Sequence, residues 1–381
     1  MVAAWIERLL GRARRRPIDG LQVEITTHCQ LHCSFCPHEA LRSSWNAQHM
    51  PMELFERLVP SLRQARFVHL QGWGEPLLHP DLFRMVQLAK AAGCEVGLTT
   101  NGVLLSREVS REMVRLGVDL VAVSIAGANS STHATLRKGS DLQQIAANVA
   151  GLAEEKRRSG SERPKIVLMY VMLRSNLPEL PQTVELAGEI GAQELAATNM
   201  DYVVNEEQDA ERAFALGNAE PASQGIIDDA TKRASSLGVL FRPYPLAAQE
   251  HVAACEAMAA PTTVVAADGG VFPCVYLSVP VDPIPRLFRG DHYEVPRLPF
   301  GQIAGADLSA LWVGAEYRAF RRIFHLRRGL ASNLAIQQVL GQEFSWDPAG
   351  RTRKGESILD QVEKGAPLPE VCRSCYKALG V

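Results

Sequence analysis

Three cysteines close together in the sequence are the residues best suited to carry out chemistry. Cys29, Cys33 and Cys36 directly follow the segment LQVEITTH. Thiolate sulfur is a soft ligand that binds zinc and iron–sulfur clusters. A cubane cluster contains four irons, so three thiolates leave one iron without a protein ligand, as in catalytic metal sites that keep an open position. That position can bind and activate a small molecule.

Two other kinds of site are compatible with these three cysteines. A zinc site needs a fourth ligand, which His28, His32 or His38 could supply. A redox-active C-x-x-C pair would leave the third cysteine without a role. The sequence has no pattern typical of a secretory signal, so the grouping of its cysteines favours metal binding in a reducing compartment over disulfides. We therefore expect a cytoplasmic protein.

A second group of cysteines lies in the last third of the sequence. Its members are Cys255, Cys274, Cys372 and Cys375. Four thiolates can fully ligate a second cluster or a zinc ion, and Gly269 allows a turn just before Cys274. A fully ligated cluster has no open iron, so we expect electron transfer or a structural role here. Cys94 stands alone at a predicted helix–strand junction, and we expect it to be a buried apolar residue.

The elements that position these cysteines alternate between strand and helix patterns up to about residue 200. The predicted strands span residues 21–26, 67–71, 95–100, 120–125, 165–172 and 194–198. The helical patterns between them span residues 51–62, 80–93, 107–117, 142–158 and 177–191, and three of these end at a glycine suited to a C-cap. This order predicts an α/β fold with a parallel sheet, open or curved toward a barrel, whose functional loops follow the strands' C-terminal ends.

Beyond about residue 240 the alternation stops and proline and glycine become more frequent, which predicts a second domain over 239–381. Within it we expect irregular structure at 280–301 and helical structure at 306–329. Residues 1–20 are expected to form a basic amphipathic extension, and 21–238 the core domain. The formal net charge of −2 gives no general reason to expect nucleic acid or an acidic membrane as a partner, and no stretch is apolar enough to span a membrane.

The C-x3-C-x2-C spacing, with Phe35 before the last cysteine, resembles the radical S-adenosylmethionine (radical SAM) superfamily. QGWGEPLLHP at residues 71–80 resembles that family's glycine-rich Gly-Glu-Pro motif. TTNG at 99–102 and VSIAG at 123–127 also resemble family positions. The resemblance implies a partial (β/α)6 barrel and a set of residues around the bound S-adenosylmethionine. They are Phe35, Gly72, Gly74, Glu75, Thr100, Asn101, Ser124 and Arg137.

The resemblance also implies roles for these residues and a reaction. Gly72 and Gly74 would let the backbone approach the ligand, and the nearby carbonyls and Glu75 would receive its ammonium group. Ser124 would contact the ribose or carboxylate, and Arg137 the carboxylate. Reductive cleavage of S-adenosylmethionine on the first 4Fe-4S cluster would give a 5'-deoxyadenosyl radical that abstracts hydrogen from a substrate. A flavodoxin or ferredoxin is the expected electron donor.

The later cysteines, with FGQIAGADLSALWVGAEYRAFR between them, resemble the auxiliary cluster domain called SPASM or, in its shorter form, Twitch. No cysteine follows Cys375, so we expect one auxiliary 4Fe-4S cluster where the full SPASM form holds two. Arginines at 318, 321, 322, 327 and 328 form a solvated helix face or recognise an anionic substrate. Asn199, Asp201 and Tyr202, just beyond the sixth strand, are candidate pocket residues by position alone.

Two substrate classes fit this prediction, together with one non-enzymatic role. The Gly-Trp-Gly-Glu-Pro-Leu form resembles maturases of metal-cofactor oxidoreductases, which favours modification of a peptide or protein. The alternative is oxidation, epimerisation or rearrangement of a small molecule such as a sugar or aminocyclitol. A non-catalytic iron–sulfur or zinc scaffold is the other possibility, and it predicts no binding of S-adenosylmethionine. Nucleic-acid modification is disfavoured because no RNA-binding module or basic excess is present.

Overall fold

The computed structural model describes residues 16–248, 252, 255, 257–344 and 358–381. Most of the N-terminal extension expected at 1–20 therefore lies outside the described residues. A sheet of nine strands forms the centre of the fold, in the order β11-β10-β1-β3-β4-β5-β7-β8-β9. All neighbouring strands pair in parallel except β10 and β11, which are antiparallel. An α/β fold with a mainly parallel sheet is thus confirmed.

The six expected strands are present and follow one another across the sheet. They are β1 (Ile18–Val23), β3 (Ala65–Leu70), β4 (Glu95–Thr100), β5 (Leu120–Ile125), β7 (Lys165–Met172) and β8 (Glu194–Asn199). β9 (Leu240–Pro243) adds to one edge, and β10 (Thr262–Val265) with β11 (Val271–Phe272) to the other. The sheet therefore continues through the boundary expected between residues 238 and 239, and that division into domains stays a prediction.

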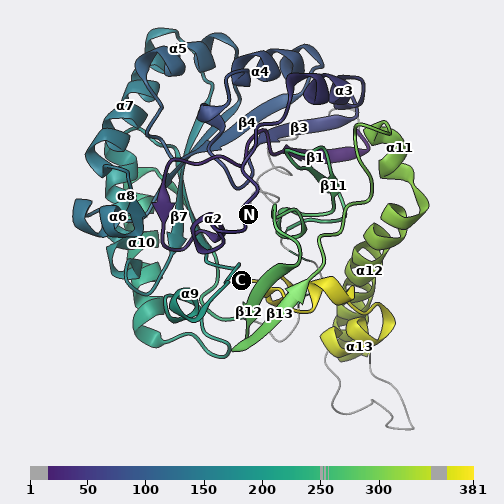
Figure 1. Cartoon of the computed structure of the whole chain (residues 1–381). Coiled ribbons are helices and arrows are strands. Elements are labelled where there is room, and N and C mark those ends of the chain that lie inside the picture. Colours follow the sequence, from purple (N-terminus) through teal and green to yellow (C-terminus); the bar gives the residue numbers. More distant parts are fainter. Residues whose placement is uncertain (1–15, 249–251, 253–254, 256, 345–357) are drawn as a thin grey trace.

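Helices lie along the outside of the curved sheet, as Figure 1 shows. They are α3 (Met52–Leu62), α4 (Leu82–Ala91), α5 (Arg107–Arg115), α7 (Leu142–Arg158), α8 (Leu180–Glu189) and α10 (Pro221–Leu237). The glycines that follow α4, α5 and α8 are Gly93, Gly117 and Gly191, with φ angles of 79°, 66° and 81°. Each ends its helix in the left-handed conformation that favours glycine, as the sequence predicts.

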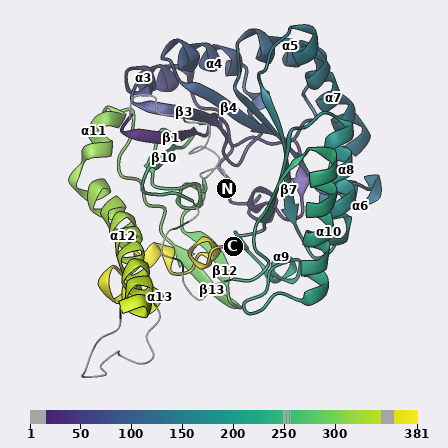
Figure 2. The same ribbon diagram turned by 180° about the vertical axis from the view of Figure 1, so that it is seen from behind.

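The alternation of side chains along the strands creates an apolar outer face and an inner face that has an apolar cluster, with Phe67, Leu120 and Val167, and polar side chains further along the strands. Val68 and Leu70 of β3 are buried in the main apolar cluster together with the helices. His69, between them, points to the opposite face. The inner side of the arc therefore carries polar side chains at the level where the strands end, and the loops that follow the strands close over it (Figures 1 and 2).

Short elements complete the loops above the sheet. β2 (His32–Cys33) pairs with β6 (Arg137–Lys138), and α2 (Pro37–Ala40), α6 (Ser130–Leu136) and α9 (Glu206–Ala210) follow β1, β5 and β8. The 3-10 helices are η1 (Pro76–Leu78), η2 (Leu177–Glu179), η3 (Val275–Leu277), η4 (Glu370–Cys372) and η5 (Tyr376–Leu379).

Two expectations about the C-terminal part were wrong in detail. Residues 280–301 were expected to be irregular, but β12 (Ile284–Phe288) and β13 (Asp291–Val295) form an antiparallel hairpin. Arg289 and Gly290 both have positive φ, 57° and 88°, which suits the two-residue turn of a twisted hairpin. The single helical pattern at 306–329 is two helices, α11 (Leu308–Val313) and α12 (Ala315–Phe344), because Gly314 between them is extended.

The C-terminal helices cover the open side of the arc. α11 packs on α3, where the hydroxyl of Ser61 donates a hydrogen bond of 3.0 Å to Asp307. α12 runs beside α13 (Ile358–Gly365) (Figure 1). None of the α12 arginines discussed above lines the central cavity, so the suggestion that they recognise an anionic substrate has no support from their position. Arg327, for example, is buried in an ion pair with Glu363 at 2.6 Å.

Candidate active site

The first cysteine group lies in the loop that follows β1, and a short ladder fixes its shape. Cys33 pairs with Arg137 across β2 and β6, and the amide of Cys36 donates to the carbonyl of Cys33 at 3.1 Å. Burial raises the pKa of the Cys36 thiol to about 12, and the neighbouring sulfurs of Cys33 and Cys29 raise it as well. The three thiols thus belong to one short loop, and buried thiols of this kind release protons when a metal binds. The pairing of β2 with β6 brings Cys33 beside Arg137.

The glycine-rich loop packs directly against the cysteine loop. A Cβ at Gly74 would lie 2.4 Å from the carbonyl oxygen of Thr26 and 2.7 Å from that of His28. A Cβ at Gly72 would lie 2.2 Å from Cγ of Glu24. Both positions therefore require glycine because neighbouring atoms occupy the space of a side chain. The sequence predicted close approach to a ligand, and the structure shows close approach to the chain itself.

Glu75 is held by the chain in a way that the sequence did not predict. Its carboxylate accepts hydrogen bonds from Thr100 Oγ1 at 2.7 Å, from the Asn101 amide at 2.6 Å and from the Leu77 amide at 3.0 Å. The side chain is 2% exposed, and burial raises its pKa while these donors lower it. Glu75 thus fastens the glycine-rich loop to the end of β4. Contact with an ammonium group stays a prediction.

Asn101 connects this network to the first cysteine group. Its Nδ2 lies 3.2 Å from Oε1 of Gln30 and 4.0 Å from Sγ of Cys29. Arg137 is 6% exposed, and its Nε is buried without a hydrogen-bond partner. A buried guanidinium nitrogen without an acceptor can bind an anionic ligand. This orphaned atom, beside the three thiols, fits the carboxylate that the resemblance assigns to this position.

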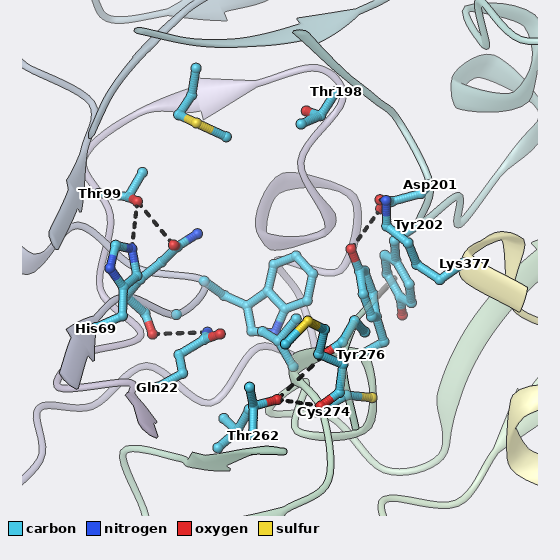
Figure 3. Close-up of a pocket in the computed structure, with 18 of the residues that line it drawn as sticks. Gln22, His69, Thr99, Thr198, Asp201, Tyr202, Thr262, Cys274, Tyr276 and Lys377 are labelled. Atoms are coloured by element: carbon cyan, nitrogen blue, oxygen red, sulfur yellow. Dashed lines mark hydrogen bonds and ion pairs between the residues drawn. The ribbon is translucent and has the colours of Figure 1, made fainter. Parts of the chain in front are cut away.

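A cavity of about 380 Å³ lies inside the arc, between the two cysteine groups (Figure 3). Cys36 contributes to its lining from the first group and Cys274 from the second. Of the residues expected near S-adenosylmethionine or the substrate, six line it: Phe35, Gly72, Ser124, Asn199, Asp201 and Tyr202. The others, Gly74, Glu75, Thr100, Asn101 and Arg137, do not, and the contacts above place them around the cysteine loop. The residues predicted from the sequence therefore fall into two sets, one around the first cysteine group and one in the wall of the cavity.

Polar residues deep in the cavity were missed from the sequence. His69 Nε2 lies 2.9 Å from Thr99 Oγ1, which donates to Oε1 of Gln71 at 2.9 Å (Figure 3). Gln22 Nε2 donates to the backbone carbonyl of Gln71 at 3.0 Å. Burial lowers the pKa of His69 to about 4, so the imidazole is neutral at pH 7. Histidine and threonine at inward positions of otherwise apolar strands were the available signal.

Aromatic side chains form the wall between the two cysteine groups. The rings of Trp73, Tyr202 and Tyr276 lie within 5.7–6.2 Å of one another, centroid to centroid. Tyr276 donates a hydrogen bond to Asp201 at 2.9 Å, and Lys377 forms an ion pair with the same carboxylate at 2.6 Å. Asp201 and Tyr202 were named from the sequence, and Trp73 was included in the glycine-rich motif. Tyr276 and Lys377 were missed, because they come from segments far along the chain.

The second cysteine group surrounds a small, largely apolar cavity of about 20 Å³. Cys255, Cys274, Cys372 and Cys375 line it together with Leu277, Phe320, Phe324 and Leu368. Burial is the largest cause of the raised pKa values of the Cys255, Cys274 and Cys372 thiols. Other sulfurs of the same group raise these pKa values further. The structure thus brings all four predicted residues together. Cys94, by contrast, is buried alone and donates to the Leu62 carbonyl at 3.1 Å, as expected.

The donor sets of both groups suit iron–sulfur clusters. All eight cysteines are free thiols, which matches thiolate ligation and not a disulfide framework. In the described part of the chain, no three His, Cys, Asp or Glu side chains converge on the position of a single metal ion. The first group combines three thiols with adjacent polar residues, and the second combines four thiols with apolar walls.

Two family models match the chain. The Radical SAM superfamily model matches residues 23–187, and the SPASM model, an iron–sulfur cluster-binding domain, matches residues 255–333. The chain belongs to the radical SAM superfamily. Its SPASM match begins at Cys255, the first member of the second cysteine group. This radical SAM chain accordingly has one SAM-binding 4Fe-4S cluster and auxiliary iron–sulfur ligation in its SPASM region, while the assignment of each single ligand stays a prediction.

Relatives of this radical SAM chain span several reactions. It is 25% identical to the tungsten-containing aldehyde ferredoxin oxidoreductase cofactor-modifying protein of Pyrococcus furiosus, over 80% of this chain and 83% of that protein. It is 29% identical to a PqqA peptide cyclase of Streptomyces rochei, over 48% of each chain. The match thus spans about half of the peptide cyclase. The solved structure of Streptococcus suis SuiB bound to S-adenosylmethionine has a TM-score of 0.58 at 14% identity, covering 93% of this chain and 77% of SuiB.

The likeness to SuiB confirms the fold of the radical SAM core with its C-terminal extension. No helix among the described residues is long and apolar enough to cross a membrane.

Proposed function

We propose that this radical SAM enzyme is an oxidoreductase that modifies a peptide or protein, with the auxiliary cluster exchanging electrons with the substrate. One observation carries the proposal: a single cavity is lined by Cys36 at one cysteine group and by Cys274 at the other. A group bound there lies between the site that generates the radical and a site that can accept an electron. The names of the Pyrococcus and Streptomyces relatives support a maturase-type role on a macromolecular substrate.

The cofactor supplies a 5'-deoxyadenosyl radical when S-adenosylmethionine is cleaved on the reduced first cluster. The chain's own residues hold the reactants and exclude water. Phe35, Gly72 and Ser124 line the cavity together with Cys36 of the first cysteine group. The aromatic rings of Trp73 and Tyr276 line the same cavity as Cys274 and exclude water from that part of its wall. We assign Arg137 to the carboxylate of S-adenosylmethionine because its buried Nε has no other acceptor.

The size and charge of the cavity favour a neutral reacting group. A volume of about 380 Å³ is at the lower end for ligand sites, so a macromolecule can insert only a side chain or a short segment. Among the described lining residues, Asp201 and Lys377 neutralise each other, and His69 is neutral. A phosphorylated substrate would find no free cation there. A neutral small molecule also fits this volume, and it remains the second candidate.

The test is anaerobic reduction of the reconstituted protein with dithionite in the presence of S-adenosylmethionine, with 5'-deoxyadenosine measured by mass spectrometry. We expect the wild type and Cys94→Ala to form 5'-deoxyadenosine. In the triple variant Cys29→Ala, Cys33→Ala, Cys36→Ala, the amount formed should fall at least about a hundredfold. Equal formation by the triple variant and the wild type would contradict the proposal. Candidate precursor peptides encoded beside the gene, added to the same assay, separate the two substrate classes through a mass change in the peptide.

The electron donor and the cellular location belong to the same proposal. We propose that a flavodoxin or ferredoxin replaces dithionite in the cell and that the protein works in the reducing environment of the cytoplasm. Formation of 5'-deoxyadenosine with a purified flavodoxin and its reductase, in place of dithionite, tests the donor.

A further inference from the structure

Arg286 is a buried cation beside the second cysteine group. It lies on β12, is 4% exposed and lines the small cavity that the four cysteines surround. Its Nη1 donates to the carbonyl of Val371 at 3.0 Å, and its Nη2 donates to the carbonyl of Tyr276 at 2.9 Å. Its Nε is buried without a hydrogen-bond partner. Two neutral carbonyls therefore fix the guanidinium, and the ring of Tyr202, whose centroid lies 6.0 Å from Cζ, adds a contact without a net charge.

No carboxylate among the described residues forms an ion pair with Arg286, in contrast to two other buried cations, Lys377 and Arg327. Lys377, which also borders the cysteines, is neutralised by Asp201 at 2.6 Å. Arg327, on α12, is neutralised by Glu363 at the same distance. A buried, unpaired charge is strongly destabilising unless something of opposite sign lies close to it. Among the described residues, the counter-charge of Arg286 is therefore not a carboxylate.

The four cysteine sulfurs are the anions available to Arg286. They line the same small cavity as Arg286, and they become anionic thiolates when they ligate a metal. A cubane core with four thiolates carries a net negative charge, and that charge grows by one when the cluster is reduced. A fixed cation beside it stabilises the reduced form more than the oxidised form, because the attraction scales with the cluster's charge. The arginine stays charged throughout, since its pKa lies far above the working range.

We infer that Arg286 is the built-in counter-cation of the auxiliary cluster and that its charge raises the cluster's reduction potential, which makes the cluster an electron acceptor. The inference rests on the proposed function, because it requires a cluster at these four cysteines. The step that it affects is a transfer of one electron: the cluster is reduced, its donor is oxidised, and no bond to Arg286 forms or breaks. Arg286 thus acts on the cluster only through its fixed positive charge. The ion pair of Lys377 with Asp201 carries no net charge.

The experiment is an anaerobic redox titration of the reconstituted full chain, followed by electron paramagnetic resonance. The background carries Cys29→Ala, Cys33→Ala and Cys36→Ala so that only the auxiliary cluster contributes a signal. Arg286→Met removes the charge, Arg286→Lys keeps it, and the double variant Lys377→Met, Asp201→Asn removes a pair without net charge. Iron content is measured for each protein.

We expect Arg286→Met to lower the potential by the equivalent of at least tenfold in the reduction equilibrium, about 59 mV for one electron. Arg286→Lys should stay close to the background protein, and the double variant should shift less than Arg286→Met. If Arg286→Met does not fold, Arg286→Gln decides the question, because its amide can still donate to a carbonyl. An unchanged potential in a neutral variant with full iron content, or equal shifts in the neutral variant and in Arg286→Lys, would overturn the inference.

The same titration separates this inference from the proposed function. If the background protein binds no iron at the four cysteines, the auxiliary cluster itself is absent, and both the cluster assignment and the role of Arg286 are wrong. If it binds about four irons and Arg286 has no effect on the potential, only the role of Arg286 is wrong.

Discussion

The two cysteine groups differ in how the chain assembles them and in what surrounds them. Cys29, Cys33 and Cys36 come from one loop, and polar groups such as Asn101 and the orphaned Nε of Arg137 adjoin them. The second group draws its members from segments as distant as residues 255 and 375 and encloses them mostly in apolar side chains, with Arg286 and Lys377 as the charged exceptions. An incomplete ligand set in polar surroundings suits binding of a further ligand, whereas a complete set in apolar surroundings suits electron transfer.

Removal of cysteines from the second group should give the largest effect, because it should abolish modification of the substrate without abolishing formation of the radical. In Cys372→Ala, Cys375→Ala we expect iron to fall from about eight to about four per chain. Formation of 5'-deoxyadenosine should stay within about threefold of wild type, because the radical forms at the first group, while modification of the substrate falls at least about a hundredfold. Iron analysis and mass spectrometry measure both. Parallel loss of 5'-deoxyadenosine would show that the two groups do not have separate roles.

A side chain on the glycine-rich loop should impair the first group selectively. Gly74→Ala puts a Cβ 2.4 Å from the Thr26 carbonyl, so the loop must move away from the cysteines. We expect affinity for S-adenosylmethionine to fall about tenfold or more, which is about 1.4 kcal/mol. Binding to the reconstituted protein by isothermal titration calorimetry is the measurement.

Gly225→Ala is the matched control for Gly74→Ala. It lies within α10 and has no atom near the new Cβ, so we expect unchanged affinity and about 0.5–1 kcal/mol of added stability. Similar affinities of the two variants would mean that close packing at Gly74 has no role in binding.

A smaller, pH-dependent effect on folding stability should arise at Glu24, which connects the glycine-rich loop to the segment after β10. Its carboxylate accepts a hydrogen bond from the Trp73 amide at 2.8 Å and contacts the Ala267 amide at 3.5 Å. Burial raises its pKa from 4.5 to about 7. The folded state therefore holds a proton that the unfolded state loses between these values, so folding stability falls as pH rises from 4.5 to 7.

Substitution of Glu24 by glutamine removes this ionisation. Relative to wild type, Glu24→Gln should gain on the order of 1–3 kcal/mol in stability at pH 8 compared with pH 5. Unfolding midpoints of the two proteins at the two pH values measure this difference. A stability difference that is the same at pH 5 and pH 8 would show that Glu24 ionises in the folded protein as it does in water.

Local sequence patterns predicted the parts of the site that are local in the chain. The three cysteines of the first group lie within one loop, and the strands next to it follow a simple alternation, so spacing alone indicated both. The glycines that end helices were predicted equally well, because the left-handed conformation at a helix C-terminus is a local requirement that favours glycine. The hairpin of β12 and β13 was missed because the prolines around it indicated irregular structure. The turn between the strands depends on the positive φ angles of Arg289 and Gly290.

Contacts between distant segments could not be predicted in this way. The short motif around Glu75 does not reveal that Thr100 and Asn101 occupy its oxygens. Nothing near Arg286 in the sequence distinguishes it from a solvated arginine, since its burial depends on how β12 packs on η4 and η3. The same holds for Lys377, whose partner Asp201 is far away along the chain. Residues that connect the two cysteine groups are therefore the ones that required the structure.

The difference between an open and a closed cluster can be measured directly by electron paramagnetic resonance of the reduced protein with and without S-adenosylmethionine. The wild type, the Cys29→Ala, Cys33→Ala, Cys36→Ala variant and the Cys372→Ala, Cys375→Ala variant are compared. We predict that S-adenosylmethionine changes the signal of the cluster at the first group and leaves the signal of the triple variant unchanged. A signal in the triple variant that responds to S-adenosylmethionine, or one in the double variant that does not, would contradict the central claim.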